Sequence, residues 1–112
     1  MSDENARTMF NAIEAGDLAR VEALVNADPA LIGAIVDNAD PLGWAAFYAQ
    51  PEIVAYFIER GADVNWRTPR GTSPLRFARN GADGAFKSHG VDRPTNLYQQ
   101  CADLLRAAGA SE

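Results

Sequence analysis

The chain has 112 residues, of which 47% are hydrophobic and 22% charged, and its net charge is -5. This length and composition are typical of one globular domain and exclude a disordered chain, a collagen and a low-complexity filament. No apolar run approaches the roughly 20 residues that span a bilayer, and the acidic start lacks the features of a signal peptide. A single cysteine, Cys101, cannot form an internal disulfide. We therefore expect a single domain over residues 1–112, located in the cytoplasm and not bound to a membrane.

The charges are distributed unevenly along the chain. Residues 1–59 contain ten carboxylates and two arginines, whereas residues 60–112 contain eight basic and five acidic side chains. Two interpretations stay open: a solvated surface with a chance bias, or a basic patch in the second half that receives an acidic surface or a phosphate. The overall negative charge argues against general affinity for nucleic acid.

A repeat with a spacing of 33 residues runs along the chain. Residues 40–46 (DPLGWAA) align with residues 73–79 (SPLRFAR), and residues 7–13 (RTMFNAI) form a looser copy. Gly61 and Gly109, near the ends of the second and third copies, are 48 residues apart, so the third copy carries 15 additional residues. Approximate repeat boundaries are therefore predicted at residues 5–34, 35–67 and 68–112.

The sequence of each unit predicts two short helices followed by a protruding turn. Asp40 and Ser73 are good N-caps, and the proline after each fits the first position of a helix. A second helix begins at Pro51 and has one broad apolar face, made by Ile53, Val54, Phe57 and Ile58. Gly61 fits the left-handed position that ends this helix, and residues 68–71 (TPRG) predict a turn. No such unit could bury its apolar face alone, so neighbouring units must stack.

This unit resembles the ankyrin repeat, whose motif is T-P-L-H-x-A. Residues 61–65 (GADVN) and 71–75 (GTSPL) carry the resemblance most clearly, and it extends over nearly the whole chain. The resemblance implies an all-α fold, an ankyrin-repeat solenoid of helix-turn-helix units joined by β-hairpin-like turns. Gly43 and Arg76 replace the motif histidine, which puts in doubt the hydrogen bonds that this histidine makes to the hairpin backbone.

The third copy departs most from the pattern. Its insertion, about residues 82–96, predicts a loop or a loop with one helical turn, which either serves a function or covers the exposed end of the stack. Asp92 or Thr95 is expected to cap the last helix, whose buried stripe is predicted to contain Leu97, Cys101, Leu104 and Leu105. Arg76 and Arg79 lie in this final copy, where they either make a polar end face or bind a ligand.

Little in the sequence predicts catalysis. His89 is the only histidine and lies in a glycine-flanked loop, which is a poor place to hold a catalytic imidazole. Cys101 falls on a helix stripe that we expect to be buried, so it is predicted to pack rather than react. One histidine and one cysteine cannot supply the usual four zinc ligands, and no phosphate-binding glycine motif is present. We therefore predict a protein that is not an enzyme and has no cofactor and no metal.

The remaining candidate is a binding surface. In proteins of this resemblance, the hairpin tips and the inner helix of each unit line a concave groove that holds partners. The positions that line this groove in the family are carried over to this sequence, and aromatic and arginine side chains, which are frequent at interfaces, are added to them. The candidate partner-binding residues are Asp37, Phe47, Tyr48, Trp66, Arg67, Pro69, Arg70, Thr72, Arg76 and Arg79. For two of these residues a structural role stays open as the alternative to binding. Trp66 would cover the base of the hairpin, and Phe47 would pack on the insertion.

We predict a non-catalytic module that binds another protein, one with an acidic surface, through its groove. The narrower version of this prediction is an inhibitor, or an immunity or regulatory partner, that occludes a surface of its target. The alternative is binding of an anion or a nucleic acid through Arg67, Arg70, Arg76 and Arg79. Self-association through the ends is a third possibility, although a monomer is favoured.

Overall fold

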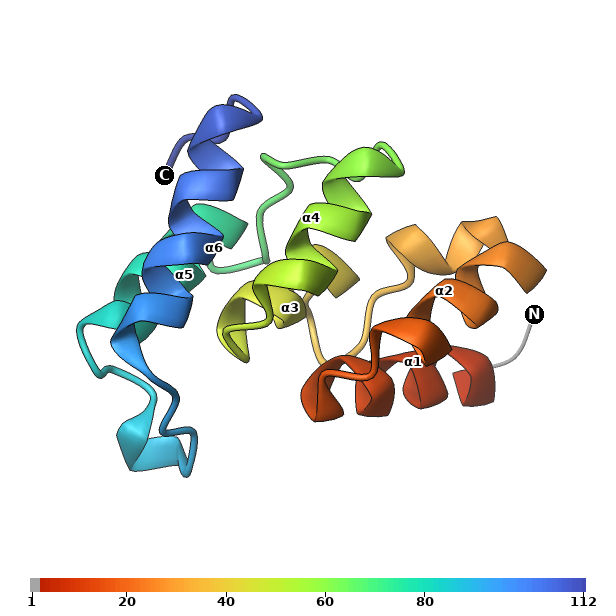
Figure 1. The fold of residues 1–112 in the computed structure, drawn as a ribbon, viewed down its shortest axis with the longest axis horizontal. Coiled ribbons are helices and arrows are strands. Elements are labelled where there is room, and N and C mark those ends of the chain that lie inside the picture. The colour runs from red at the N-terminus through yellow and green to blue at the C-terminus, as the bar shows by residue number, and fades with distance from the viewer. Residues whose placement is uncertain (1–2) are drawn as a thin grey trace.

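The computed structural model describes residues 3–112, and their side chains from Glu4 onward. In this range the chain forms helices and no β-strand, which confirms the all-α prediction. The helices are α1 (Asp3–Ala15), α2 (Leu18–Ala27), η1 (Pro29–Gly33), α3 (Pro41–Phe47), α4 (Pro51–Glu59), α5 (Pro74–Ala82), η2 (Lys87–His89) and α6 (Thr95–Ala107). Three pairs, α1 with α2, α3 with α4 and α5 with α6, lie side by side in chain order (Figure 1).

Capping side chains begin the first helix of the second and third pairs. The Asp40 carboxylate accepts a hydrogen bond from the Gly43 backbone N–H at 2.9 Å, and the Ser73 hydroxyl accepts one from Arg76 N–H at 3.1 Å. A proline follows each cap and is the first residue of α3 or α5. Both predicted N-caps are therefore confirmed, and each helix starts where its otherwise unpaired N–H groups find an acceptor.

The second helix of the middle pair also begins and ends as predicted. Pro51 is its first residue, and Ile53, Val54 and Phe57 are fully buried on its inner face. Gly61 follows the helix with a φ of 88°, a left-handed conformation that side-chain-bearing residues rarely adopt. The Ala62 N–H then closes the helix end by donating to the Phe57 carbonyl at 3.0 Å.

The pairs are held together by small and aliphatic side chains at repeated positions. Helix α3 packs against α1 and α5, and α4 packs against α2 and α6. Leu42 and Leu75, 33 residues apart, are both buried, and so are Ala45 and Ala78. Because alanine side chains are short, neighbouring helices can approach closely, and the middle pair is covered on both sides.

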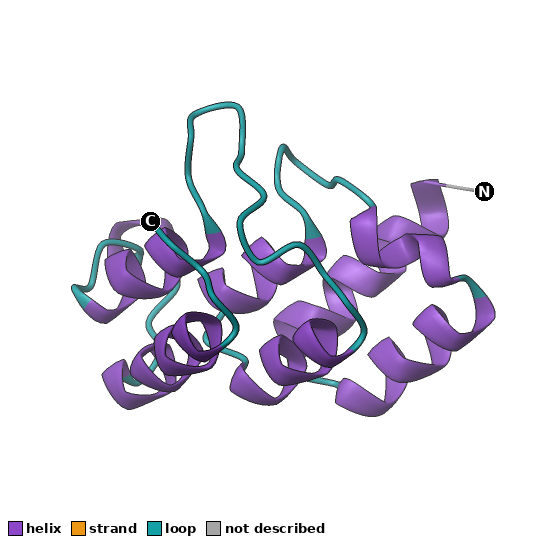
Figure 2. Cartoon of the chain, turned by 90° about the horizontal axis from the view of Figure 1, so that it is seen from above, coloured by secondary structure: helices purple, strands orange, loops and turns teal. Residues whose placement is uncertain are grey.

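The loops between the pairs, residues 34–40 and 60–73, protrude on the same side of the helices (Figure 2). In the first loop, Val36 and Ala39 form an isolated antiparallel bridge, and the two residues between them, Asp37 and Asn38, have φ angles of 49° and 71°. In the second, the Gly71 N–H donates to the Thr68 carbonyl at 2.7 Å, as the predicted turn requires. Both loops are therefore closed by their own backbone hydrogen bonds.

The start of the last helix differs from the prediction. Asp92 and Thr95 are both wrong as caps, because the residue before α6 is Pro94 and no side chain makes a capping hydrogen bond there. Thr95 is instead the first residue of the helix. The Leu97 N–H donates to the Pro94 carbonyl at 3.1 Å, so the backbone closes this helix start.

The buried stripe of α6 is also rotated relative to the prediction. Cys101 and Leu105 are fully buried as expected, but Leu97 and Leu104 are only half-buried, and their places in the core are taken by Tyr98 and Ala102. Tyr98 turns inward because its hydroxyl donates to the Phe47 carbonyl at 2.7 Å and its ring lies against Gly81. The orientation of α6 about its axis is thus set by contacts with other segments of the chain. The spacing of apolar residues within α6 does not predict these contacts.

Gly81→Ala is expected to destabilise the protein by about 1–3 kcal/mol, since an added Cβ would lie 2.2 Å from the Tyr98 ring. Chemical denaturation measures the change. Gly33→Ala is the matched control, because no atom lies within 4 Å of a Cβ at Gly33. Equal stabilities of the two variants would contradict the close packing of Gly81 on Tyr98.

Asp40→Asn is expected to change how stability depends on pH. Burial raises the pKa of Asp40 from 3.8 to about 6, although the hydrogen bond from Gly43 works in the opposite direction. Since the folded state holds the proton more tightly, the contribution of Asp40 to stability is greatest below about pH 4 and is lost as the pH rises through 6. Asparagine keeps the cap without titrating.

The stability of the Asp40→Asn variant relative to the parent chain should therefore increase between pH 4 and 7, by at most about 3 kcal/mol. Urea denaturation at several pH values measures this difference. Asp17→Asn, which alters the exposed cap of α2, is the control. A difference that stays constant over this range would show that burial does not perturb Asp40.

Candidate partner-binding groove

Two adjoining hollows lie on the side of the molecule from which the loops protrude. The first has a volume of about 480 Å³ and the second about 420 Å³. They share Asp37, Trp44, Phe47 and Phe86, so we describe them together as the groove. The further residues that line the groove are Asn38, Ala39, Thr68, Pro69, Arg70, Thr72, Phe77 and Asn80 in the first hollow and Phe10, Tyr48, His89 and Val91 in the second.

Aromatic rings form the floor of the groove, with Phe47 at their centre. The Phe47 ring centroid lies 4.3 Å from that of Phe86, 4.9 Å from Tyr48 and 5.4 Å from Trp44. The Phe77 ring lies edge-on to Phe47, 6.0 Å away. Edge-to-face contacts of this kind are favourable for aromatic pairs. The floor is therefore a fixed apolar surface assembled from α3, α5 and the insertion.

The insertion contributes directly to this surface. Residues 83–94 connect α5 to α6 and contain the short helix η2, in agreement with the predicted loop with one helical turn. Phe86 from this segment packs on Phe47, so the interpretation in which Phe47 contacts the insertion is confirmed. His89 and Val91 line the second hollow. The insertion thus forms one wall of the groove.

The rims of the groove carry opposite charges on the two protruding loops. Asp37 on the first loop forms an ion pair with Arg7 at 3.7 Å, and both side chains are more than 60% exposed. Arg70 on the second loop is exposed and has no hydrogen-bond or ion-pair partner among residues 3–112. Because exposed ion pairs contribute little, Asp37 and Arg70 are both available to an incoming ligand.

Six of the ten predicted partner-binding residues line the groove, namely Asp37, Phe47, Tyr48, Pro69, Arg70 and Thr72. Tyr48 is only 9% exposed, so its ring contributes to the floor more than to an open surface. The Arg93 guanidinium lies 5.6 Å from the Tyr48 ring centroid, within the range of a cation–π interaction. Burial is the main reason why the pKa of Tyr48 is raised.

The other four predicted residues do not line the groove. Trp66 is half-buried at the base of the second loop. Arg76 and Arg79 on α5 both form ion pairs with the Glu112 carboxylate, and Arg67 donates to the main-chain oxygen of Glu112. The structure therefore divides the predicted set into six residues of the groove, a separate group of three arginines, and Trp66.

The prediction missed four aromatic residues that line the groove: Phe10, Trp44, Phe77 and Phe86. The sequence contained a signal for two of them, because Trp44 and Phe77 occupy the same position in the 33-residue alignment. Equivalent positions in two stacked copies lie on the same side of the stack, so the two rings should lie near each other. Phe86 had no such signal, since it lies in the insertion. Its place depends on how the insertion folds back over α3 and α5.

The two residues with reactive side chains lie apart. His89 is exposed, whereas Cys101 is fully buried, and burial raises the pKa of its thiol to about 12. Within residues 3–112, no group of three or more His, Cys, Asp or Glu side chains is placed to hold a metal ion. None of the helices in this range has the length and apolar character needed to cross a membrane.

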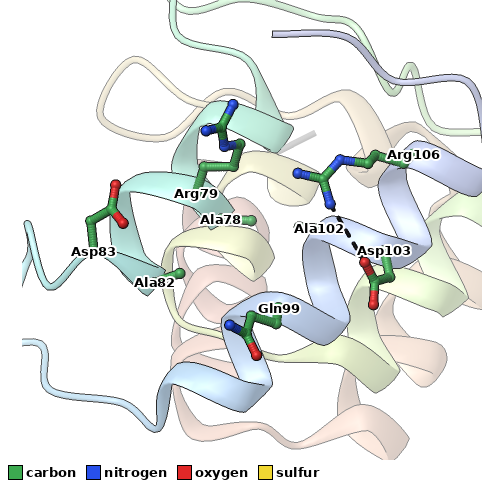
Figure 3. Close-up of a pocket in the computed structure, with 8 residues that line it drawn as sticks. All are labelled: Ala78, Arg79, Ala82, Asp83, Gln99, Ala102, Asp103 and Arg106. Atoms are coloured by element: carbon green, nitrogen blue, oxygen red, sulfur yellow. Dashed lines mark hydrogen bonds and ion pairs between the residues drawn. The ribbon is translucent and has the colours of Figure 1, made fainter.

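A third hollow, of about 400 Å³, lies on the outer face of the α5–α6 pair, where charged side chains surround a floor of alanines (Figure 3). In the alignment, Arg79 takes the position of the fully buried Ala46, and Arg106 takes the position of Ile58. The corresponding face of the middle pair packs against α5 and α6. Arginines at these positions make this face polar and unsuited to stacking against another apolar pair.

Trp44→Phe is expected to loosen the tip of the first loop. The Trp44 indole N–H donates to the Val36 carbonyl at 2.7 Å, and phenylalanine keeps an aromatic ring but removes this bond. Amide hydrogen exchange of Val36 and Ala39 should become at least several-fold faster, with the helices unaffected. Trp66→Phe is the control, and an equal effect of both variants would contradict a specific role for Trp44.

A comparison with protein families supplies an independent identification. The family model of the ankyrin repeat matches residues 37–66, which include α3, α4 and the tip of the first protruding loop. No curated protein matches the chain. The matched segment also contains the Asp40 cap, the buried faces of α3 and α4 and the closing Gly61, all of which agree with the repeat pattern. Residues 37–66 of the chain therefore form an ankyrin repeat.

Proposed function

We propose that this protein is a non-catalytic module that binds a partner protein in the groove. We further propose that it consists of three repeats, near residues 5–34, 35–67 and 68–112, stacked as a short solenoid. Three helical pairs in chain order support this division, as do equivalent buried residues in the second and third pairs. Ankyrin repeats are in general interaction modules, and the family match supports the same role here.

The observation that carries the proposal is an aromatic floor between two protruding loops. Aromatic side chains give a binding surface a large apolar area at a small cost in conformational entropy, and they are frequent among the residues that dominate binding energy. Here the floor is already ordered, because each ring packs on at least one other. A partner segment with an apolar side chain would therefore meet a preformed site.

The charge on the second loop favours an acidic partner. Arg70 has no partner of its own among the described residues, so a carboxylate of the bound protein could pair with it without displacing another group. A module that covers an acidic surface of its target in this way would act as an inhibitor or as an immunity or regulatory partner. We propose this role for a monomer in the cytoplasm.

The alternative, an anion or nucleic-acid site, has less support. Its four arginines do not form one continuous patch, because Arg70 lines the groove whereas Arg67, Arg76 and Arg79 lie outside it and contact Glu112. Binding to nucleic acid would weaken steeply with salt, since it depends on the release of counterions. Binding in an aromatic groove would respond to salt only weakly, so a salt titration separates the two functions.

Arg70→Ala is expected to weaken partner binding about ten-fold while leaving the melting temperature nearly unchanged, because the side chain is exposed and unpaired. The partner is first recovered from native extract on the immobilised protein and identified by mass spectrometry. Its affinity for each variant is then measured by surface plasmon resonance.

Arg20→Ala is the matched control for this measurement, since Arg20 is an exposed arginine on α2, away from the groove. It should bind the partner as the parent chain does. Equal affinities of the Arg70→Ala variant and the parent chain would contradict the proposed site, and a large fall in melting temperature would assign Arg70 a structural role.

A further inference from the structure

The last residues of the chain lie against the third helical pair and the second protruding loop. The Ser111 N–H donates to the Asn65 side-chain oxygen at 2.8 Å, and the Asn65 amide donates to the Gly109 carbonyl at 3.4 Å. These bonds hold residues 109–112 beside the loop. The segment brings Glu112 to the face of α5 that carries Arg76 and Arg79.

Three guanidinium groups converge on Glu112. Arg76 and Arg79, one turn apart on α5, pair with the two oxygens of its carboxylate, the first at 3.4 Å. Arg67, on the loop, donates to the main-chain oxygen of Glu112 and also to the Gly71 carbonyl at 3.2 Å. We name Arg67, Arg76 and Arg79 the arginine cradle. Its members come from two elements, so the tertiary structure is needed to assemble it.

We propose that the arginine cradle is a binding site for an acidic side chain of a partner protein, and that Glu112 occupies it in the free chain. The site lies outside the groove, so the proposal does not rest on the function proposed for the groove. A carboxylate held by Arg76 and Arg79 is already present in the structure, which shows that the geometry fits this ligand.

The balance of charge supports a ligand beyond Glu112. The Glu112 side chain brings one carboxylate to three guanidinium groups, and residues 3–112 place no other Asp or Glu side chain in an ion pair with the cradle. An acidic segment that presents two or more carboxylates would satisfy the cradle better than Glu112 alone does.

The contact with Glu112 is also suited to exchange. The Arg76 and Arg79 side chains are 57% and 51% exposed, and that of Glu112 is 30% exposed. Exposed ion pairs are weak, and Glu112 competes with an external ligand mainly through its high local concentration. Glu112 is thus expected to lower the affinity for an external acidic segment by several-fold rather than to block it.

The test uses Glu112→Gln, which keeps the size of the side chain and removes its charge, and a synthetic peptide of four glutamates blocked at both ends. The variant is expected to bind this peptide about five-fold more tightly than the parent chain at low salt, as measured by titration with NMR detection of the arginine side-chain N–H signals. Signals of Arg67, Arg76 and Arg79 should shift.

Adding Arg76→Ala and Arg79→Ala to Glu112→Gln should weaken peptide binding at least ten-fold. The matched control adds Arg20→Ala and Arg60→Ala instead, which removes the same charge from exposed arginines outside the cradle. Circular dichroism checks that each variant is folded.

Equal affinities of the Glu112→Gln variant and the parent chain would overturn the proposal, as would tight peptide binding after the loss of Arg76 and Arg79. Inorganic phosphate is titrated in parallel. Binding of phosphate without binding of the peptide would overturn the choice of a carboxylate ligand.

Discussion

Burial of the middle helical pair between its two neighbours is the interaction on which the rest of the structure depends. Leu42, Ala45 and Ala46 of α3 and Val54 of α4 are fully buried, although these helices have only seven and nine residues. Helices this short are marginal alone and gain their stability from tertiary packing. The small side chains on α3 set a close spacing between pairs, and this spacing places the two protruding loops beside each other.

The groove is a consequence of this spacing. Because α3 and α5 have equivalent positions in neighbouring pairs, Trp44 and Phe77 are placed on the same side, one pair apart. Phe47 lies between Trp44 and Phe86 in a continuous row of rings. The groove is therefore lined by residues that also hold the pairs in register, so substitutions in its floor are expected to affect stability as well as any binding there.

The third pair differs from the second in ways that have one physical cause. Its outer face has no neighbouring pair among the described residues, and arginines replace alanine and isoleucine there. Arg79 lines the hollow on this outer face, and its guanidinium pairs with Glu112. Its partner Arg76 lies one turn earlier on α5.

The sequence by itself determined the features that depend on local patterns. The caps Asp40 and Ser73, the start of α4 at Pro51, the turn at Gly61 and the buried alanines follow from spacing and backbone chemistry, so they could be predicted, as could the positions of Asp37 and Arg70 at loop tips. Only the tertiary structure decided which side of α6 faces the core, that Phe86 closes the groove and that three arginines meet at Glu112. Each of these depends on contacts between segments far apart in the chain, such as Tyr98 with Phe47, and no local period encodes such contacts.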